Sequence, residues 1–163
     1  MTQSQDFLLE LGQLTEQSVT NLAASFKALP PSPYLDGAFR LRRYSHFNFQ
    51  QGNLSQLPTK AFVQSGDINL FQGDVERVYP EIEEQVINSD AFKEMFICFK
   101  EIAGICDDKP IEVHQMRIIA NSEALTETAP EGVHQDGFES LAVFVIERNN
   151  IKGGEIRVHT GKE

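Results

Sequence analysis

A histidine and an aspartate stand two residues apart within residues 129–140, APEGVHQDGFES, a segment rich in turn-forming residues. In an extended chain, side chains two residues apart point to the same side, so His134 and Asp136 converge while Gln135 points away. Such a pair can bind a metal ion, form a hydrogen bond or only cap a turn. As metal ligands, an imidazole and a carboxylate at this spacing begin the 2-His-1-carboxylate facial triad, which suits Fe(II) and leaves coordination positions open.

An H-x-D pair alone is a weak signal, because such pairs arise often by chance. The surrounding sequence favours the metal: Gly132 and Gly137 flank the pair, and the apolar run SLAVFVIE follows at residues 140–147. This run is apolar on both faces, which is typical of a central strand covered on both sides. We expect such a strand to hold the two ligands in place.

Two further predicted strands carry polar side chains among apolar ones. Residues 38–49, AFRLRRYSHFNF, place Arg43 on the face of the phenylalanine and leucine side chains. Residues 111–120, IEVHQMRIIA, place Gln115 and Arg117 on the face of the isoleucine and valine side chains. A buried charge is costly unless it is paired, and a guanidinium grips a carboxylate with two hydrogen bonds. We therefore predict a carboxylate-binding role for these three residues, with an internal salt bridge or a slip in register as the alternative.

The order of the elements favours an α+β, β-rich fold, because helices come first and strands follow without regular βαβ alternation. Apolar residues at helical spacing predict the first helix, and the prolines of LPPSP end it because proline cannot continue a helix. A second stripe of apolar residues predicts the next helix. We predict helices over residues 6–29 and from a cap at Asn88 or Ser89 to about Gly104, strands over 38–49, 111–120, 140–147 and 155–160, and a turn over 148–154.

Composition limits the class of protein and its partners. The 163 residues fit a single domain, 1–163, and 40% apolar residues suit a globular core. The net charge of -10 argues against nucleic acid and anionic membranes as partners. Cys98 and Cys106 would lie about 12 Å apart on one helix, beyond the roughly 7 Å disulfide limit, so we expect buried, reduced thiols. With no signal peptide or membrane span, a cytoplasmic location is the expectation.

Four motifs carry a resemblance to a known family: YLDGAFRLRRYS, VHQMRIIA, APEGVHQDGFES and ERNNIKGGEIRV, in this order from Tyr34 onward. Together they resemble the bacterial 2-oxoglutarate–Fe(II) dioxygenases that include free L-amino-acid hydroxylases of the isoleucine 4-hydroxylase type. The resemblance implies a double-stranded β-helix (jelly-roll, cupin-like) core with N-terminal helices. It also implies Fe(II), 2-oxoglutarate and O2, with His134 and Asp136 as the first two iron ligands. The implied reaction hydroxylates a free L-amino acid or a similar small molecule.

The facial triad also needs a distal histidine, which in a jelly roll lies on the order of 50 residues further on. Only residues 137–163 follow Asp136, and we expect His159, the one histidine among them, to be a surface imidazole. The chain is therefore predicted to be the N-terminal and central part of the jelly roll, incomplete at its C-terminus. The distal histidine and the basic anchor for 2-oxoglutarate are expected beyond residue 163.

Two other functions compete with the dioxygenase. The first is a non-catalytic jelly-roll module that pairs with another chain through an exposed strand edge, which allows a homo-oligomer. The second is a metal-independent hydrolase that uses His134 and Asp136 as an acid–base pair, although the sequence has no nucleophile-elbow motif. His46 and His114 fall on strand faces opposite the arginines named above, and we expect them to be structural or solvent-facing.

Overall fold

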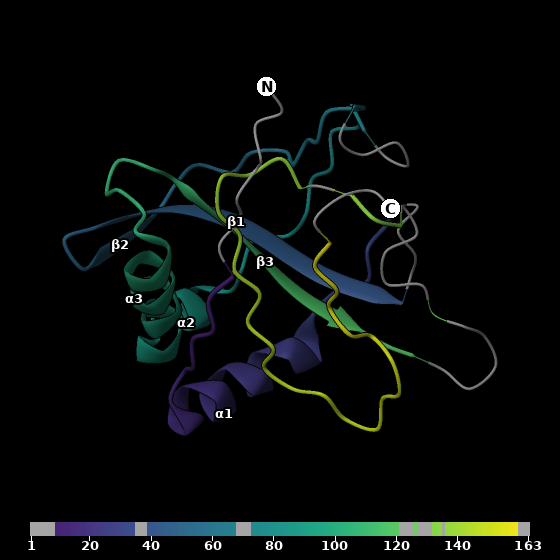
Figure 1. Ribbon diagram of the computed structural model, residues 1–163, viewed down its shortest axis with the longest axis horizontal. Helices are drawn as coiled ribbons and strands as arrows, with labels where there is room; N and C mark the ends of the chain where they lie inside the picture. The colour runs from purple at the N-terminus through teal and green to yellow at the C-terminus, as the bar shows by residue number, and fades with distance from the viewer. Residues whose placement is uncertain are drawn as a thin grey trace.

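The computed structural model describes residues 9–34, 39–67, 73–120, 126, 132–134 and 136–159. The described part contains a three-stranded antiparallel sheet in the order β2-β1-β3, together with helices (Figure 1). The long central strand β1 pairs with β2 and with β3, which comes from much later in the chain. The elements are α1 (Glu16–Ser25), a 3₁₀ turn (Phe26–Ala28), β1 (Arg40–Gln50), β2 (Asn53–Gln56), α2 (Glu84–Ile87), α3 (Asp90–Ala103) and β3 (Ile111–Ile118).

Helices together with an antiparallel sheet agree with the predicted α+β class. The jelly-roll core stays a prediction, because the described sheet has three strands. Within the described ranges, no helix is long and apolar enough to cross a membrane.

Helix α3 begins and ends where the sequence predicts. The hydroxyl of Ser89 accepts a hydrogen bond from the backbone N–H of Phe92 at 3.1 Å, so Ser89 and not Asn88 is the N-cap. Gly104 ends the helix with φ 61°, in the left-handed conformation that glycine adopts without strain. The ring of Phe92 lies 5.4 Å from the ring of Phe47 on β1, so the predicted stripe packs in the core.

Helix α1 is shorter than the helix predicted over residues 6–29. Of the described residues, 9–14 are not helical, and Thr15 is the N-cap whose hydroxyl accepts from the N–H of Ser18 at 3.3 Å. Glu94 on α3 accounts for the late start, because its carboxylate accepts hydrogen bonds from the backbone N–H of Thr15 at 2.7 Å and from its hydroxyl at 2.9 Å. These bonds from a distant helix favour an extended conformation at Thr15, which sequence periodicity does not reveal.

The two faces of the β1–β3 pair differ in chemistry. Residues opposed across an antiparallel pair share a face, so Phe47 and Ile111 lie on one face and Tyr44 and His114 on the other. The first face belongs to the main core, which includes residues of α1 and α3, and Phe47 is 0% exposed there. The second face carries a smaller aromatic cluster around Tyr44 and Phe62.

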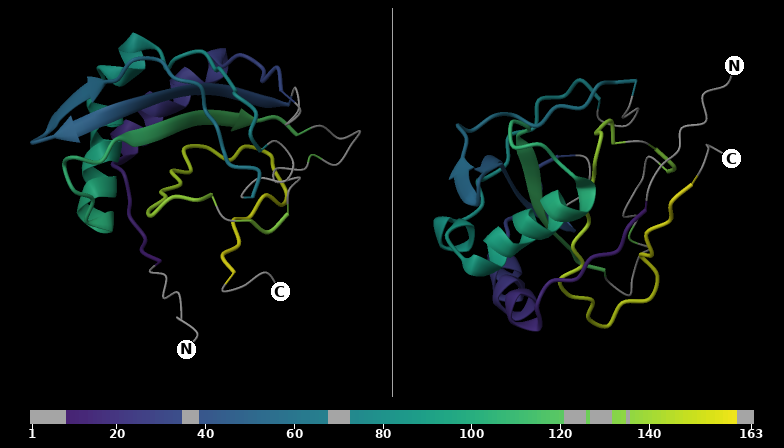
Figure 2. Two further views of the ribbon diagram at one scale, coloured as in Figure 1. Left: turned by 90° about the horizontal axis from the view of Figure 1, so that it is seen from above. Right: turned by 60° about the vertical axis from the view of Figure 1, so that its left-hand side comes forward.

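The strands predicted over 140–147 and 155–160 are not formed in the described part of the chain. Figure 2 shows this part as an irregular coil beside the sheet, and Thr160 lies outside the described residues. Phe144 and Ile146 pack against the main core, as one face of the predicted strand should. The other face is exposed: Leu141 62%, Val143 58% and Val145 58%. The prediction of a strand covered on both sides is therefore wrong here, because no described strand lies beside it to pair its backbone.

The turn predicted over residues 148–154 is present. Asn150, Gly153 and Gly154 have positive φ angles of 50°, 85° and 70°. Arg148 closes the turn by donating from Nη1 to the carbonyl oxygen of Gly154 at 3.0 Å. Glycine is favoured at these positions because it adopts positive φ without strain.

Both cysteines are free thiols, but they differ in their surroundings. Cys98 lies on α3 and is partly buried, whereas Cys106 follows Gly104 and is exposed. The prediction that both are buried on one helix is therefore wrong for Cys106, because the helix ends before that residue.

Candidate metal site and cavity

His134 and Asp136 lie close together, as their spacing predicts. His134 Nε2 is 3.4 Å from Asp136 Oδ1, and the two side chains are 28% and 37% exposed. On the other side of the ring, Nδ1 lies 2.7 Å from the carbonyl oxygen of Gly132. Gly132 has a φ of 72°, a conformation that favours glycine. The Gly132 carbonyl therefore orients the His134 ring, and both side chains of the pair are partly exposed.

The contact with Gly132 fixes one proton on the His134 ring. A carbonyl oxygen only accepts hydrogen bonds, so Nδ1 carries a proton and donates it. Nε2 then either carries a second proton or directs a lone pair at the Asp136 carboxylate. Two facing lone pairs repel one another unless a cation lies between them. Metal-bound histidines are oriented in the same way, with the second ring N–H donated to a carbonyl or carboxylate.

The donor set fits two positions of an iron site. Ligands bonded at about 2.1 Å and at a right angle lie about 3.0 Å apart, so the observed 3.4 Å needs only a small adjustment. Imidazole and carboxylate are the donors of the facial triad. Among the residues that the structure describes, no third histidine, cysteine, aspartate or glutamate joins them in a metal-binding group. His159 is exposed, as predicted.

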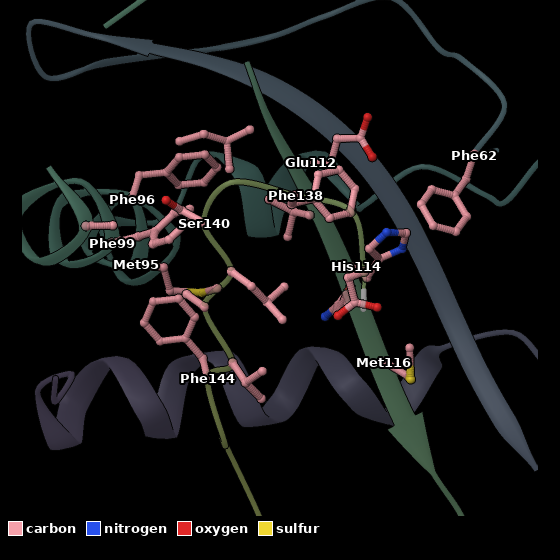
Figure 3. Close-up of a pocket in the computed structure, with 18 of the residues that line it drawn as sticks. Phe62, Met95, Phe96, Phe99, Glu112, His114, Met116, Phe138, Ser140 and Phe144 are labelled. Atoms are coloured by element: carbon pink, nitrogen blue, oxygen red, sulfur yellow. The ribbon is translucent and has the colours of Figure 1, made fainter. Parts of the chain in front are cut away.

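An open cavity of about 1160 Å³ includes His134 and Asp136 in its lining. Small-molecule sites commonly occupy about 300–1,000 Å³, so this cavity has room for one. Figure 3 shows Met95, Phe96 and Phe99 of α3 on one side and Phe62 and His114 on the other, with Phe138 and Phe144 in the segment that crosses between them. The cavity therefore has an apolar wall against α3 and a polar wall along β3.

The structure places the three predicted carboxylate-binding residues in different surroundings. Arg43 donates to Glu83 Oε1 and to a backbone carbonyl, both at 2.8 Å, which is the internal salt bridge of the alternative interpretation. Gln115 lines the cavity, but its amide donates to the hydroxyl of Ser25 at 2.6 Å. Arg117 is exposed on β3. Only Gln115 of the three contributes to the cavity wall.

The sequence interpretation missed the cationic cluster on the other face of the sheet. Arg42 and Arg77 are buried, at 5% and 3% exposed, and their guanidinium groups lie over the rings of Tyr79 and Phe62 at 4.5 and 4.7 Å. His114, partly buried, has a pKa well below its usual value because of burial and because both arginines lie near it. The rings that the two arginines contact, Phe62 and Tyr79, lie in other segments, so strand periodicity gave no signal for this cluster.

Residues 23–163 match the family described as 2OG-Fe dioxygenase, so the chain belongs to that family. The resemblance seen in the sequence is confirmed at this level, whereas the isoleucine hydroxylase type stays a prediction. The fold is similar to the crystal structure of a bsmA homolog from Methylobium petroleophilum PM1, with a TM-score of 0.58 and 21% identity. The match covers 74% of this chain and 51% of that one, so the chain spans about half the length of that structure. The chain has no significant match among curated proteins.

Family membership implies Fe(II), 2-oxoglutarate and O2 as cofactor and co-substrates. The fit of the described residues to iron is partial, because His134 and Asp136 provide the imidazole and the carboxylate while a third ligand is missing from the described ranges. The donor types of the pair are therefore compatible with the iron that the family implies.

Proposed function

We propose that this chain carries part of the active site of an Fe(II)/2-oxoglutarate-dependent dioxygenase, with His134 and Asp136 as two iron ligands. 2-Oxoglutarate and O2 are the co-substrates, and a free L-amino acid or similar small molecule is hydroxylated at an unactivated C–H bond. The observation that carries this proposal is the 3.4 Å approach of Nε2 to Oδ1 on a cavity wall, in a chain of the 2OG-Fe dioxygenase family. The substrate class rests on the resemblance to amino-acid hydroxylases.

The proposed architecture is a single jelly-roll domain to which residues 1–163 contribute the N-terminal and central part. The antiparallel β1–β3 pair and the likeness to the bsmA homolog support it. The exposed apolar face of residues 140–147 also supports it, because a further strand would cover that face. The third iron ligand and the basic anchor for 2-oxoglutarate are expected outside the described residues.

Bound iron together with 2-oxoglutarate supplies the oxidising chemistry, and the chain's own residues position the reactants. The Gly132 carbonyl holds the His134 ring so that Nε2 faces Asp136. The wall formed by Phe96, Phe99 and other α3 side chains is apolar, so it can receive an aliphatic side chain and exclude water from the target C–H bond.

Succinate formation from 2-oxoglutarate by the full-length protein, measured with Fe(II), ascorbate and a panel of free amino acids, tests the proposal. We expect succinate that depends on the amino acid, and its loss in His134→Ala and Asp136→Ala. The exposed residues His159 and Asp108 provide matched controls, and His159→Ala and Asp108→Ala should retain activity. No succinate with any amino acid, or equal rates in His134→Ala and the parent, would contradict the proposal.

A non-catalytic interaction module is the second candidate. The exposed apolar row formed by Leu141, Val143 and Val145 favours it, and so does the position of β3 at one edge of the described sheet. In this case a second copy of the chain covers the row. Light scattering would then give a metal-free dimer, and Val143→Asp would convert it to a monomer.

A further inference from the structure

Arg77 is a buried guanidinium whose charge no carboxylate in the described part neutralises. The side chain is 3% exposed, and its Nε is buried without a hydrogen-bond partner. Nη2 donates to Gln64 Oε1 at 2.9 Å, which is a neutral amide oxygen. Of the ion pairs formed between described residues, none includes Arg77.

Arg42 brings a second positive charge to the same aromatic ring. Its guanidinium carbon lies 5.4 Å from the centroid of Phe62, and that of Arg77 lies 4.7 Å from it. Arg42 also donates to the hydroxyl of Tyr79 at 3.2 Å and from Nη2 to His114 Nδ1 at 2.8 Å. Since Nδ1 accepts, the His114 ring is neutral, and its low pKa agrees with this. His114 therefore adds no charge of its own to this cluster.

A buried charge without a counter-ion costs free energy, so this arrangement calls for an anion. Glu112 on β3 also lines the cavity, but it is paired with Lys60. The cation–π contact with Phe62 attracts Arg77 without neutralising it. The partner expected for the Arg77 guanidinium is a carboxylate, whose two oxygens match its planar N–H pairs.

The position of the cluster indicates where the anion comes from. The cavity lining contains both the cationic cluster and the candidate iron ligands, namely Arg42, Arg77, Gln64, His114, His134 and Asp136. Phe62 and His114 face each other at the polar wall, with ring centroids 4.6 Å apart (Figure 3). The arginines and the His134–Asp136 pair therefore border the same cavity.

We propose that Arg77 binds a carboxylate group of a small molecule that occupies this cavity. Arg42, bonded to Tyr79 and His114, holds its guanidinium over the same Phe62 ring. The identity of the molecule rests on the proposed function. The carboxylate belongs to the amino-acid substrate, or to 2-oxoglutarate if Arg77 takes the place of the basic anchor expected beyond residue 163. Both molecules share the chemistry that a guanidinium recognises.

Isothermal titration of the metal-free protein in EDTA, at constant ionic strength, tests this inference separately from iron chemistry. The probes are 2-oxoglutarate, each common L-amino acid, and the carboxamide of any amino acid that binds. Binding of 2-oxoglutarate assigns the site to the co-substrate, whereas binding of an amino acid but not of its carboxamide assigns it to the substrate. We expect Arg77→Met to weaken this binding about tenfold or more, and Arg77→Lys to weaken it less.

The unfolding midpoint without ligand separates a binding role from a structural one. Because Arg77→Met removes an unneutralised buried charge, we expect a free protein at least as stable as the parent. Arg157→Gln, at an exposed arginine, is the control and should change neither binding nor stability. Unchanged affinity in Arg77→Met, or no carboxylate bound by the parent, would overturn the inference. His134→Ala should still bind the carboxylate ligand in EDTA. The titration therefore tests the Arg77 site even if His134 does not bind iron.

Discussion

Nη2 of Arg42 on β1 donates a hydrogen bond to Nδ1 of His114 on β3 at 2.8 Å. In the sheet register Tyr44 is opposite His114, so this bond runs diagonally across the antiparallel pair. The bond makes His114 an acceptor next to a permanent positive charge, which disfavours protonation of the ring. Burial is the larger cause of its low pKa, and Arg42 and Arg77 add to it.

This relationship predicts an acid-sensitive contribution to stability. The pKa of His114 lies well below its usual value of 6.5 in the folded protein, so the unfolded chain binds more protons between those two values. The free energy of unfolding should therefore fall as the pH drops below about 6.5, by at most about 1.4 kcal/mol per pH unit. Above that pH, His114 should contribute no pH dependence.

Urea unfolding of the parent and of His114→Gln at pH 7.5 and pH 5.5 measures this effect. We expect His114→Gln to lose less stability than the parent on acidification, because glutamine still offers an acceptor to Arg42 without titrating. His159→Gln is the matched control at an exposed histidine and should behave like the parent. Equal losses in the parent and in His114→Gln would show that His114 does not titrate as described.

Glu94 links α3 to the beginning of α1 through Thr15 and Ser18. Hydrogen bonds from the Ser18 hydroxyl and from Thr15 hold the pKa of the carboxyl below its usual value of 4.5. The stabilisation is therefore present above pH 4.5 and is lost as the pH falls through the lower, folded-state pKa. Glu94→Gln should lower the thermal midpoint at pH 7 and have a smaller effect at pH 3.

The exposed residue Glu101, on the same helix, provides the comparison for this prediction. Glu101→Gln should leave the thermal midpoint close to that of the parent at both pH values. If the thermal midpoints of the parent and of Glu94→Gln differ by the same amount at pH 7 and at pH 3, ionisation of Glu94 does not stabilise the contact between the helices.

Phe47 is the central side chain of the main core. It is 0% exposed, and its ring lies 5.4 Å from those of both Phe92 and Phe96. Phe47→Ala should lower the free energy of unfolding by about 3–5 kcal/mol, measured by urea denaturation. Phe138, which is 51% exposed, gives the control, and Phe138→Ala should cost far less. Similar losses in the two variants would contradict the assignment of the core.

Local sequence was sufficient for features that depend on neighbouring residues. Helix α3 follows from its cap at Ser89, its apolar stripe and Gly104, and the approach of His134 to Asp136 follows from their spacing. Contacts between distant segments could not be read in this way. The start of α1 depends on Glu94, and residues 140–147 lack the second covering layer that their composition predicts.

The cationic cluster shows the same limit in the candidate site. Arg42 and Arg77 belong to separate segments, and the Phe62 ring from a third brings them together. Periodicity identified Arg43 as the arginine on the apolar face, which is correct for the strand. It gave no information on Glu83, whose carboxylate neutralises Arg43. Arg42 lines the cavity, whereas Arg43 does not.

Anaerobic titration of the full-length protein with Fe(II), read by calorimetry, tests most directly whether His134 and Asp136 bind iron. We expect one Fe(II) per chain, with affinity reduced about tenfold or more in His134→Ala and in Asp136→Ala, and unchanged in His159→Ala. No affinity of the parent for Fe(II), or equal affinity in the parent and in both site variants, would contradict the assignment of these two residues as iron ligands.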